Sequence, residues 1–303
     1  RAYLGKRFTA EELQAKFNIG NLATHKFSEI GAWHDPKKST PFKREQLRFS
    51  QMATKECFDE VFVKYGRTLK PDLIVGQWNH LGNFSQINGD ERCLLPKELW
   101  AKDEDYLWYS TGSSAFYTDL KNDFLGEGTL QARYLRGATG GKPFTLGKYE
   151  STRTRAAIAE LAANGGVPMG FYTRFTNPEA REIITRYYKF IRKHDNIYRN
   201  NKSHAEAVLL FPRKAVHAGN VDTVAKFRET GRALLENHVL FDILPDDIVT
   251  PERLTAYQEV YRPGDKAVKG ATEFTAPKTV RVSANRPAKG DALHLHFVNY
   301  NRT

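Results

Sequence analysis

Residues 143–174, PFTLGKYESTRTRAAIAELAANGGVPMGFYTR, contain a strand, a helix and a second strand in close succession. The apolar and aromatic run that begins at Phe144 stops at Glu150, where a fully polar segment begins. The run TRAAIAELAA, residues 154–163, has high helix propensity, and the Asn-Gly-Gly that follows is a C-terminal stop signal. The second strand ends at Arg174. This pattern predicts a strand-helix-strand unit of a parallel α/β fold.

Glu150 is the leading candidate for a catalytic residue, because it places a carboxylate at a strand end. The carboxyl ends of parallel strands face the ligand. We therefore expect four residues to converge on one ligand-binding opening: Tyr149, Glu150, Tyr172 and Arg174. Arg153 and Arg155 lie near a helix start, where positive charge is unfavourable for the helix dipole, which suggests that at least one of them has another role near Glu150. The alternative is a surface salt bridge between Glu150 and Arg153 that has no function.

Residues 1–195 alternate between predicted helices and strands. Besides the unit above, we expect helices over residues 1–19, 43–66, 126–138 and 178–194, strands over 72–80 and 105–110, and an irregular loop over 20–42. The economical architecture is a parallel sheet covered by helices. Four strands cannot close an eight-stranded barrel. We therefore expect this region to be the second half of a (β/α)8 barrel whose first half lies upstream in a longer protein.

A second α/β unit is predicted after residue 203. Strands over 205–212 and 238–245 flank a helix over 222–237 whose apolar residues suit packing on a sheet. No dinucleotide-binding fingerprint follows the first of these strands, so we expect a structural or assembly role. From residue 273 onward, the segments TVRVSAN and ALHLHFVNYN predict a β-rich tail.

Composition predicts a soluble globular chain and leaves its compartment open. Of the 303 residues, 40% are hydrophobic and 12% aromatic, which allows a substantial core. No apolar run approaches the roughly 20 residues that span a bilayer, so no membrane partner is expected. The net charge of +11 would assist binding to nucleic acid or to acidic polysaccharide, but the basic residues are spread along the chain. A solvated basic surface is the favoured interpretation, without a nucleic-acid partner.

The sequence predicts no cofactor and no metal. The glycine-rich segment RGATGGKPF, residues 136–144, lacks the first Gly and the final Ser or Thr of a phosphate-binding loop. Cys57 and Cys93 are distant in sequence and form neither a disulfide framework nor a zinc signature.

Aromatic and hydrogen-bonding residues occur at the ends of the predicted strands. Sugars bind through aromatic platforms with flanking hydrogen bonds. Six residues are candidates for such a pocket wall: Trp78, Asn79, His80, Trp108, Tyr109 and Tyr172. Core packing is the alternative for each aromatic taken alone, and a structural histidine is the alternative for His80. Residues 33–35, Trp-His-Asp, lie on a long loop that either covers the pocket or forms an exposed turn.

The segment GKYESTRTRAAIAELAANGGVPMGFYTR, the strand ends WNH and LWYS, and the following α/β unit resemble β-galactosidases of glycoside hydrolase family 42. The resemblance covers most of the chain and is one of pattern rather than close identity. It implies part of a catalytic (β/α)8 barrel over residues 1–200 and a flavodoxin-like trimerisation domain over 201–270. The start of a small β domain would occupy 271–303.

The resemblance also implies a retaining glycoside hydrolase that cleaves β-linked sugars. Glu150 falls at the position of the family's nucleophile, at the end of the seventh barrel strand. The acid/base glutamate of the family follows the fourth strand, which would lie before Arg1. In this mechanism one carboxylate attacks the anomeric carbon, and a protonated partner roughly 5–5.5 Å away donates to the leaving oxygen. Arg153 or Arg174 would favour the charged form of Glu150.

Two classes of function follow from these observations. The first is a glycoside hydrolase with a carbohydrate substrate, for which the basic charge favours an anionic polymer, and with a homo-oligomeric full-length form, either trimer or dimer. The second is a noncatalytic carbohydrate-binding or assembly protein that retains the same architecture. The presence or absence of an Asn-Glu pair in the sequence before Arg1 would decide between these two classes.

Overall fold

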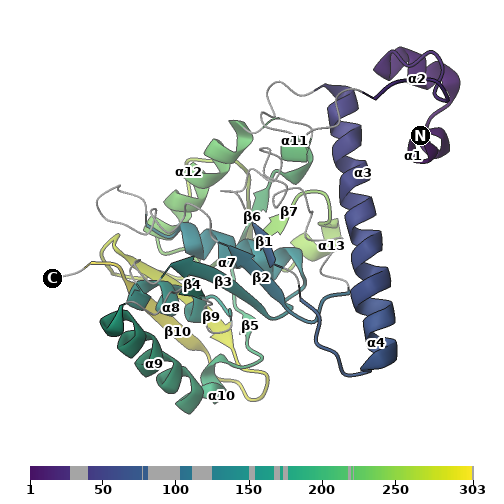
Figure 1. The fold of residues 1–303 in the computed structure, drawn as a ribbon. Coiled ribbons are helices and arrows are strands. Elements are labelled where there is room, and N and C mark those ends of the chain that lie inside the picture. Colours follow the sequence, from purple (N-terminus) through teal and green to yellow (C-terminus); the bar gives the residue numbers. More distant parts are fainter. Residues whose placement is uncertain are drawn as a thin grey trace.

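The computed structural model describes residues 1–27, 40–76, 78–80, 103–110, 125–149, 154–166, 171–172, 177–217, 220 and 222–301. At 47, 51, 78–80, 109–110, 148–149, 171–172 and 217 only the backbone is described. Within these residues the chain is a mixed α/β fold with two parallel sheets and one antiparallel sheet. In Figure 1 the sheets lie together, and a long helix, α3, stands at their side with the N-terminal helices near its upper end.

The N-terminal region forms two helices, α1 (Ala2–Arg7) and α2 (Ala10–Phe17). The single helix predicted over 1–19 is therefore wrong. Its pattern is interrupted by a capping box, in which the Thr9 hydroxyl accepts from the Glu12 backbone N–H at 3.2 Å and the Glu12 carboxylate accepts from the Thr9 N–H at 3.0 Å. Such a box starts a new helix and ends the preceding one.

The helix predicted over 43–66 is confirmed and is longer than expected. It begins as α3 (Pro41–Phe58), continues through a π-helical segment (Asp59–Tyr65) and ends as α4 (Gly66–Leu69). The Thr40 side chain caps its start, and a proline at the first helical turn costs no hydrogen bond there.

The first parallel sheet has the strand order β1-β2-β3-β4. Its strands are β1 (Trp78–His80), β2 (Leu107–Ser110), β3 (Phe144–Tyr149) and β4 (Phe171–Tyr172). The helices that follow β2, β3 and β4 are α7 (Glu127–Ala138), α8 (Thr154–Ala163) and α9 (Pro178–Lys193), and α9 is followed by the short α10 (Asp195–Tyr198). The three longer helices confirm the helices predicted for these regions.

The second parallel sheet has the order β7-β6-β8. Its strands are β6 (Ala207–Phe211), β7 (Phe241–Pro245) and β8 (Glu259–Tyr261), and its helices are α11 (Arg213–His217), α12 (Asp222–Glu236) and α13 (Pro251–Leu254). All five residues of β6 are buried, as expected for a central parallel strand covered on both faces. The strand-helix-strand pattern predicted here is confirmed.

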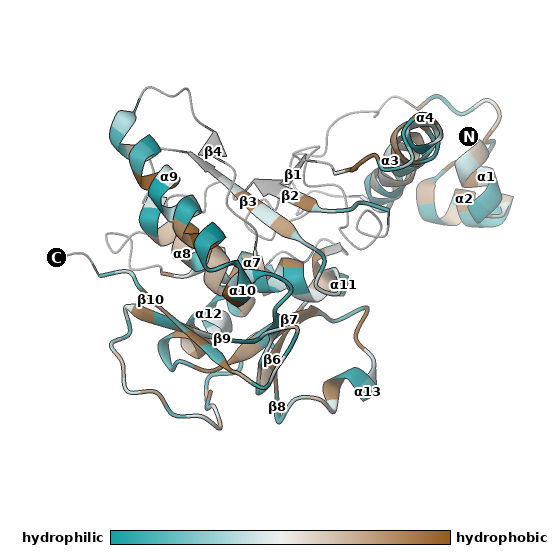
Figure 2. Ribbon diagram, turned by 90° about the horizontal axis from the view of Figure 1, so that it is seen from below, coloured by the Kyte–Doolittle hydropathy of each residue, from teal (hydrophilic) through white to brown (hydrophobic). Residues whose placement is uncertain are grey.

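Helix α7 lies between the two parallel sheets, with β3 on one side and β7 on the other (Figure 2). It is buried continuously from Glu127 to Leu135. The Tyr134 ring meets the ring of Phe211 on β6 edge-to-face, with centroids 4.9 Å apart. The same core joins the apolar residues of β2 and β3 to those of β6, β7 and α12. One continuous core therefore holds both sheets to α7.

The third sheet is antiparallel, with the order β10-β9-β5. Its strands are β5 (Lys202–Ser203), β9 (Val280–Arg286) and β10 (His294–Asn299). Helix α8 packs against β10 and against α9, whose alternating teal and brown residues in Figure 2 mark a helix with one apolar face. The β-rich tail predicted after residue 273 is confirmed.

None of the helices in the described ranges is long and apolar enough to cross a membrane. The same ranges contain no group of three or more His, Cys, Asp or Glu residues that could hold a metal ion.

Candidate functional site

The carboxyl ends of β1, β2, β3 and β4 lie along one edge of the first sheet, because all four strands are parallel. The register sets Trp78 beside Trp108 and Asn79 beside Tyr109. One strand further, Trp108 lies beside Thr145. Five of the predicted pocket residues, on β1 and β2, are thus neighbours along this edge: Trp78, Asn79, His80, Trp108 and Tyr109.

The fourth strand carries the remaining pocket residue. Tyr172 lies in register with Tyr149, the last residue of β3. Tyr149 is two residues beyond Gly147, which is level with Ser110 and His80. The β3–β4 end of the edge therefore extends further along the strand direction than the β1–β2 end.

The two faces of this sheet have different surroundings. Leu107, Phe144 and Leu146 are almost fully buried in the core formed with α7 and α8. Side chains alternate between faces along a strand, so Thr145 and Trp108 belong to the opposite face. Thr145 is 8% exposed and Trp108 is partly exposed. The carboxyl edge of the strands is therefore the candidate site, and Trp108 and Thr145 belong to the face opposite the helices.

Several predicted residues lie outside the described part of the chain. These are Glu150, Arg153 and Arg174, together with the loop residues 33–35. Strand β3 is described up to Tyr149, so Glu150 is the residue that directly follows it in the sequence.

Beneath the candidate edge, α8 caps the start of α7. The residue before α7 is Gly126, which has φ 97° and no side chain to accept the first amide hydrogens. The carboxylate of Glu160 on α8 accepts instead from the Thr129 backbone N–H at 2.7 Å and from the Thr129 hydroxyl at 2.9 Å. A Cβ on Gly128 would lie 2.5 Å from this carboxylate, so a larger residue there would displace the Glu160 side chain. A negative charge at a helix N-terminus is favourable, and it fixes α8 against α7.

A second buried carboxylate, that of Glu127, lies at the same helix start. It accepts from Arg228 Nε of α12 at 3.1 Å. Burial raises its pKa, and the opposing charge of Arg228 lowers it, so that the net shift is upward. This ion pair ties α12 to the first turn of α7. Sequence analysis did not single out these two glutamates, although Glu160, an acid within the alanine-rich α8, is a usable signal.

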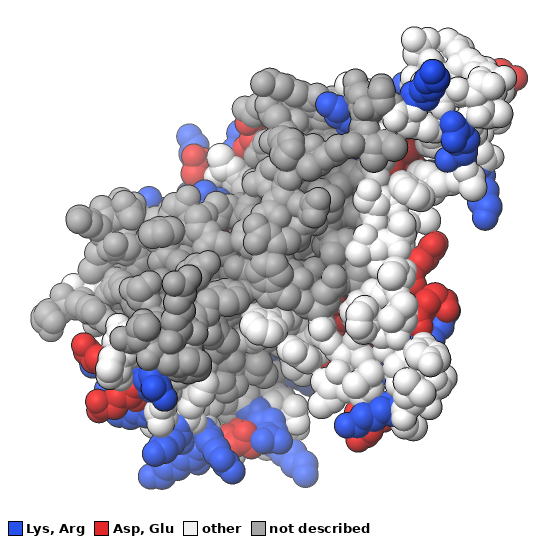
Figure 3. Space-filling model, viewed as in Figure 1, with Lys and Arg blue, Asp and Glu red and all other residues white. Residues whose placement is uncertain are grey.

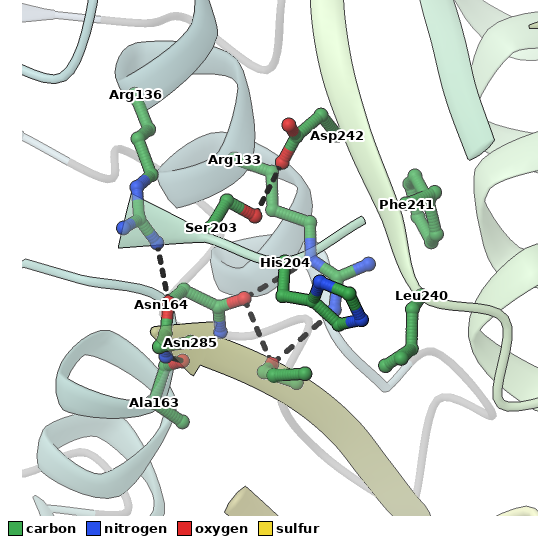
Figure 4. A pocket seen from close by; sticks show the side chains of 12 residues that line it. Arg133, Arg136, Ala163, Asn164, Ser203, His204, Leu240, Phe241, Asp242 and Asn285 are labelled. Carbon is green, nitrogen blue, oxygen red and sulfur yellow. Dashed lines mark hydrogen bonds between the residues drawn. The ribbon is translucent and has the colours of Figure 1, made fainter. Parts of the chain in front are cut away.

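Two arginines on α7 form a polar junction with the end of α8, the second parallel sheet and the antiparallel sheet (Figure 4). Arg133 Nε donates to Asn164 Oδ1 at the end of α8, at 3.0 Å. Its Nη2 donates to the Val282 carbonyl oxygen at 2.9 Å and to Ser283 Oγ at 3.2 Å, both on β9. Its guanidinium carbon lies 4.3 Å from the ring centre of Phe241 on β7. Burial lowers the pKa of Arg133 to about 10, so the group remains charged at neutral pH.

The second arginine, Arg136, extends the junction to β5 and β9. Its Nη1 donates to Asn285 Oδ1 and its Nη2 to the Asn201 carbonyl oxygen, each at 2.7 Å. Asp242 on β7 is the main opposing charge for both arginines, and it accepts from Ser203 Oγ at 2.6 Å. The small cavity between these groups, about 10 Å³, is the size of one water molecule. Such a space suits a structural junction and is too small for a sugar.

We expect Arg133→Met to lower the free energy of unfolding by about 3–5 kcal/mol, because it leaves buried acceptors on α8 and β9 without their charged donor. Urea unfolding followed by circular dichroism measures this change. Arg155→Met on the exposed side of α8 is the matched control and should change stability by less than about 0.5 kcal/mol. Equal stability of the two variants would contradict the role given to the Arg133 junction.

At the level of sequence, neither a protein-family model nor a curated protein matches the chain. Comparison with solved structures gives clear matches. The chain aligns with a β-galactosidase from Bacillus circulans sp. alkalophilus with a TM-score of 0.59 and 16% identity. It aligns with a catalytic mutant of a family 42 β-galactosidase from G. stearothermophilus with a TM-score of 0.63 and 14% identity. Its alignment with a cold-adapted β-galactosidase from Rahnella sp. R3 has a TM-score of 0.57 and 12% identity.

The chain shares the fold of the family 42 β-galactosidases. The resemblance predicted from sequence is confirmed at the level of fold. Each alignment covers 86% of this chain and 43–44% of the other, so the chain spans less than half the length of these β-galactosidases.

Proposed function

We propose that this chain is part of a retaining glycoside hydrolase that cleaves β-linked sugars, as a β-galactosidase does. The observation that carries the proposal is the fold shared with family 42 β-galactosidases, together with the four parallel strands whose carboxyl ends meet at one edge. In barrel enzymes, catalytic residues come from the ends of several such strands.

In this proposal, residues 1–200 form the second half of a (β/α)8 barrel, and the first half lies upstream. The sequential order of β1 to β4, with helices α7 and α8 in the intervening segments, supports it. Residues 201–270 correspond to the flavodoxin-like trimerisation domain, and β6, β7 and β8 form its parallel sheet. Residues 271–303 begin the small β domain. The full-length protein would then be a homo-oligomer, either a trimer or a dimer.

Glu150 is the proposed nucleophile, because it directly follows β3, the strand that corresponds to the seventh strand of the barrel. Its carboxylate would attack the anomeric carbon, while an acid/base glutamate upstream protonates the leaving oxygen. Arg153 and Arg174 follow β3 and β4 in the sequence and would keep Glu150 ionised. Water then hydrolyses the glycosyl ester with help from the same acid/base group, which gives overall retention of configuration.

The substrate-binding role is proposed for the residues at the ends of the neighbouring strands. Trp78, Asn79, His80, Trp108 and Tyr109 lie side by side on β1 and β2, and Tyr172 lies beside the end of β3. Aromatic rings and flanking amide or imidazole groups suit a sugar ring. The substrate is a carbohydrate, and the excess of positive charge, +11, favours an acidic one.

The test is a screen of aryl β-glycosides, beginning with the galactoside, with the full-length protein. We expect hydrolysis of at least one β-glycoside, and proton NMR of the first product should show the β-anomer before mutarotation. Release of the α-anomer would exclude the retaining mechanism. Binding of sugars without turnover of any glycoside would favour the noncatalytic alternative.

A further inference from the structure

A basic groove lies between the N-terminal helices and α11, and none of the residues that line it belongs to the first sheet. It has a volume of about 690 Å³, within the range of small-molecule binding sites. Figure 1 shows α1 and α2 near the start of α3, and α11 on the other side of α3. The basic side chains that line the groove come from all of these elements: Arg7, Lys16, Arg44, Arg48 and Lys214.

Two acidic side chains also line the groove, and both already have partners. Glu45, whose side chain is 6% exposed, accepts from the Tyr3 hydroxyl at 2.5 Å and pairs with Arg7 at 2.8 Å. Asp247 pairs with the buried Arg213 at 2.6 Å. Five basic groups line the groove against two acidic ones, and Lys16 also pairs with Glu12 at 2.8 Å, which leaves an excess of two positive charges. Within the described residues, the exposed ammonium of Lys214 has no ion-pair partner.

Two phenylalanines, Phe8 and Phe17, form the aromatic part of the groove lining, here called its aromatic floor. The rings of Phe8 and Phe17 meet edge-to-face, with centroids 5.0 Å apart, and both are partly exposed. Arg7 Cζ lies 5.5 Å and Lys16 Nζ 5.2 Å from the centre of the Phe8 ring. Cationic groups therefore flank an apolar surface, in a region where Figure 3 shows basic side chains over α1 and α2.

We propose that this groove binds an acidic oligosaccharide, a chain of sugars that carry sulfate or carboxylate groups. The aromatic floor would contact the apolar face of a pyranose ring, and the surrounding cations would contact its anionic groups. The choice of a sugar rests on the proposed glycosidase function. If the chain is part of a glycosidase, the groove would hold an anionic part of the carbohydrate substrate at a distance from the bond that is cleaved. A nucleic acid is the competing polyanion, and its binding would depend on charge more than on the aromatic floor.

The experiment is isothermal titration calorimetry of the full chain with a sulfated galactose tetrasaccharide. The unsulfated tetrasaccharide and an oligodeoxynucleotide of equal charge are the comparison ligands. The test variant is Lys16→Gln with Lys214→Gln, because both lysines are exposed and removing them should leave the fold intact. The matched control is Lys278→Gln with Lys289→Gln, two exposed lysines in the region of β9 and β10.

We expect the sulfated tetrasaccharide to bind, and the Lys16/Lys214 variant to bind it about tenfold more weakly, as two lost charge contacts would cause. The control variant should bind as the unmodified chain does, and added salt should weaken binding. Three results would overturn the proposal: unchanged affinity in the test variant, equal affinity for the unsulfated sugar, or tighter binding of the oligonucleotide through the same two lysines. Because the assay records binding alone, failure of hydrolysis would leave this result untouched, and loss of groove binding would leave the hydrolase test untouched.

Discussion

Glu150→Gln is expected to lower kcat on an aryl β-glycoside by about 10⁴-fold or more, because an amide cannot form the covalent glycosyl intermediate. The change is isosteric, and Glu150 follows a strand whose apolar residues are buried independently of it. The free energy of unfolding should therefore stay within about 0.5 kcal/mol of the original. Initial rates with the full-length protein, combined with urea unfolding, measure both quantities.

Added azide distinguishes between two roles for Glu150, the nucleophile and the acid/base residue. With Glu150→Gly, azide should restore turnover of an activated aryl β-glycoside and give the α-glycosyl azide, because the small anion replaces the missing carboxylate in a single inversion. A β-glycosyl azide would instead identify Glu150 as the acid/base group. Glu179→Gln on the exposed first turn of α9 is the matched control and should leave kcat unchanged. Glu150 would be removed from the mechanism if its Gln variant kept more than about a tenth of the activity.

The elements around the candidate site could be predicted from sequence because their signals are local. A buried apolar run followed by a polar segment located β3 next to Glu150, and the alanine-rich run with its Asn-Gly-Gly stop gave α8 with its observed bounds. Parallel order followed from the alternation of strands and helices. The split between α1 and α2 was also local, and the Thr9–Glu12 capping box was a signal available in the sequence.

The support beneath the site could not be predicted, because its contacts join residues that are distant in sequence. Arg133 meets Val282, which is 149 residues away, and Glu160 caps a helix that starts 33 residues before it. No periodicity encodes such pairs. They become visible only once α7 is known to lie between the two parallel sheets, where charged groups must find partners away from water.

Gly137→Ala is expected to lower the free energy of unfolding by more than about 3 kcal/mol, the severe end of overpacking. Gly137 lies on α7, and an added Cβ would overlap the carbonyl oxygen of Ile243 on β7 and approach its carbonyl carbon to 3.0 Å. The obstructing atoms belong to the Ile243 backbone, which cannot adopt another rotamer as a side chain can. The helix would have to move away from β7, and this would separate Arg133 from Phe241, now 4.3 Å apart.

Helix propensity predicts the opposite sign, which makes the substitution a sharp test of the packing. Alanine in a helix interior is favoured over glycine by about 1 kcal/mol when nothing obstructs it. Gly5→Ala on α1 is the matched control, since its Cβ would meet only the Leu22 side chain at 3.4 Å, and it should be neutral or stabilising. Urea unfolding of both variants, with near-ultraviolet circular dichroism for the aromatic core, gives the comparison. If Gly137→Ala matched Gly5→Ala in stability, α7 could not lie in backbone contact with β7, and the arginine junction that joins α7 to the second parallel sheet and the antiparallel sheet would have to be revised.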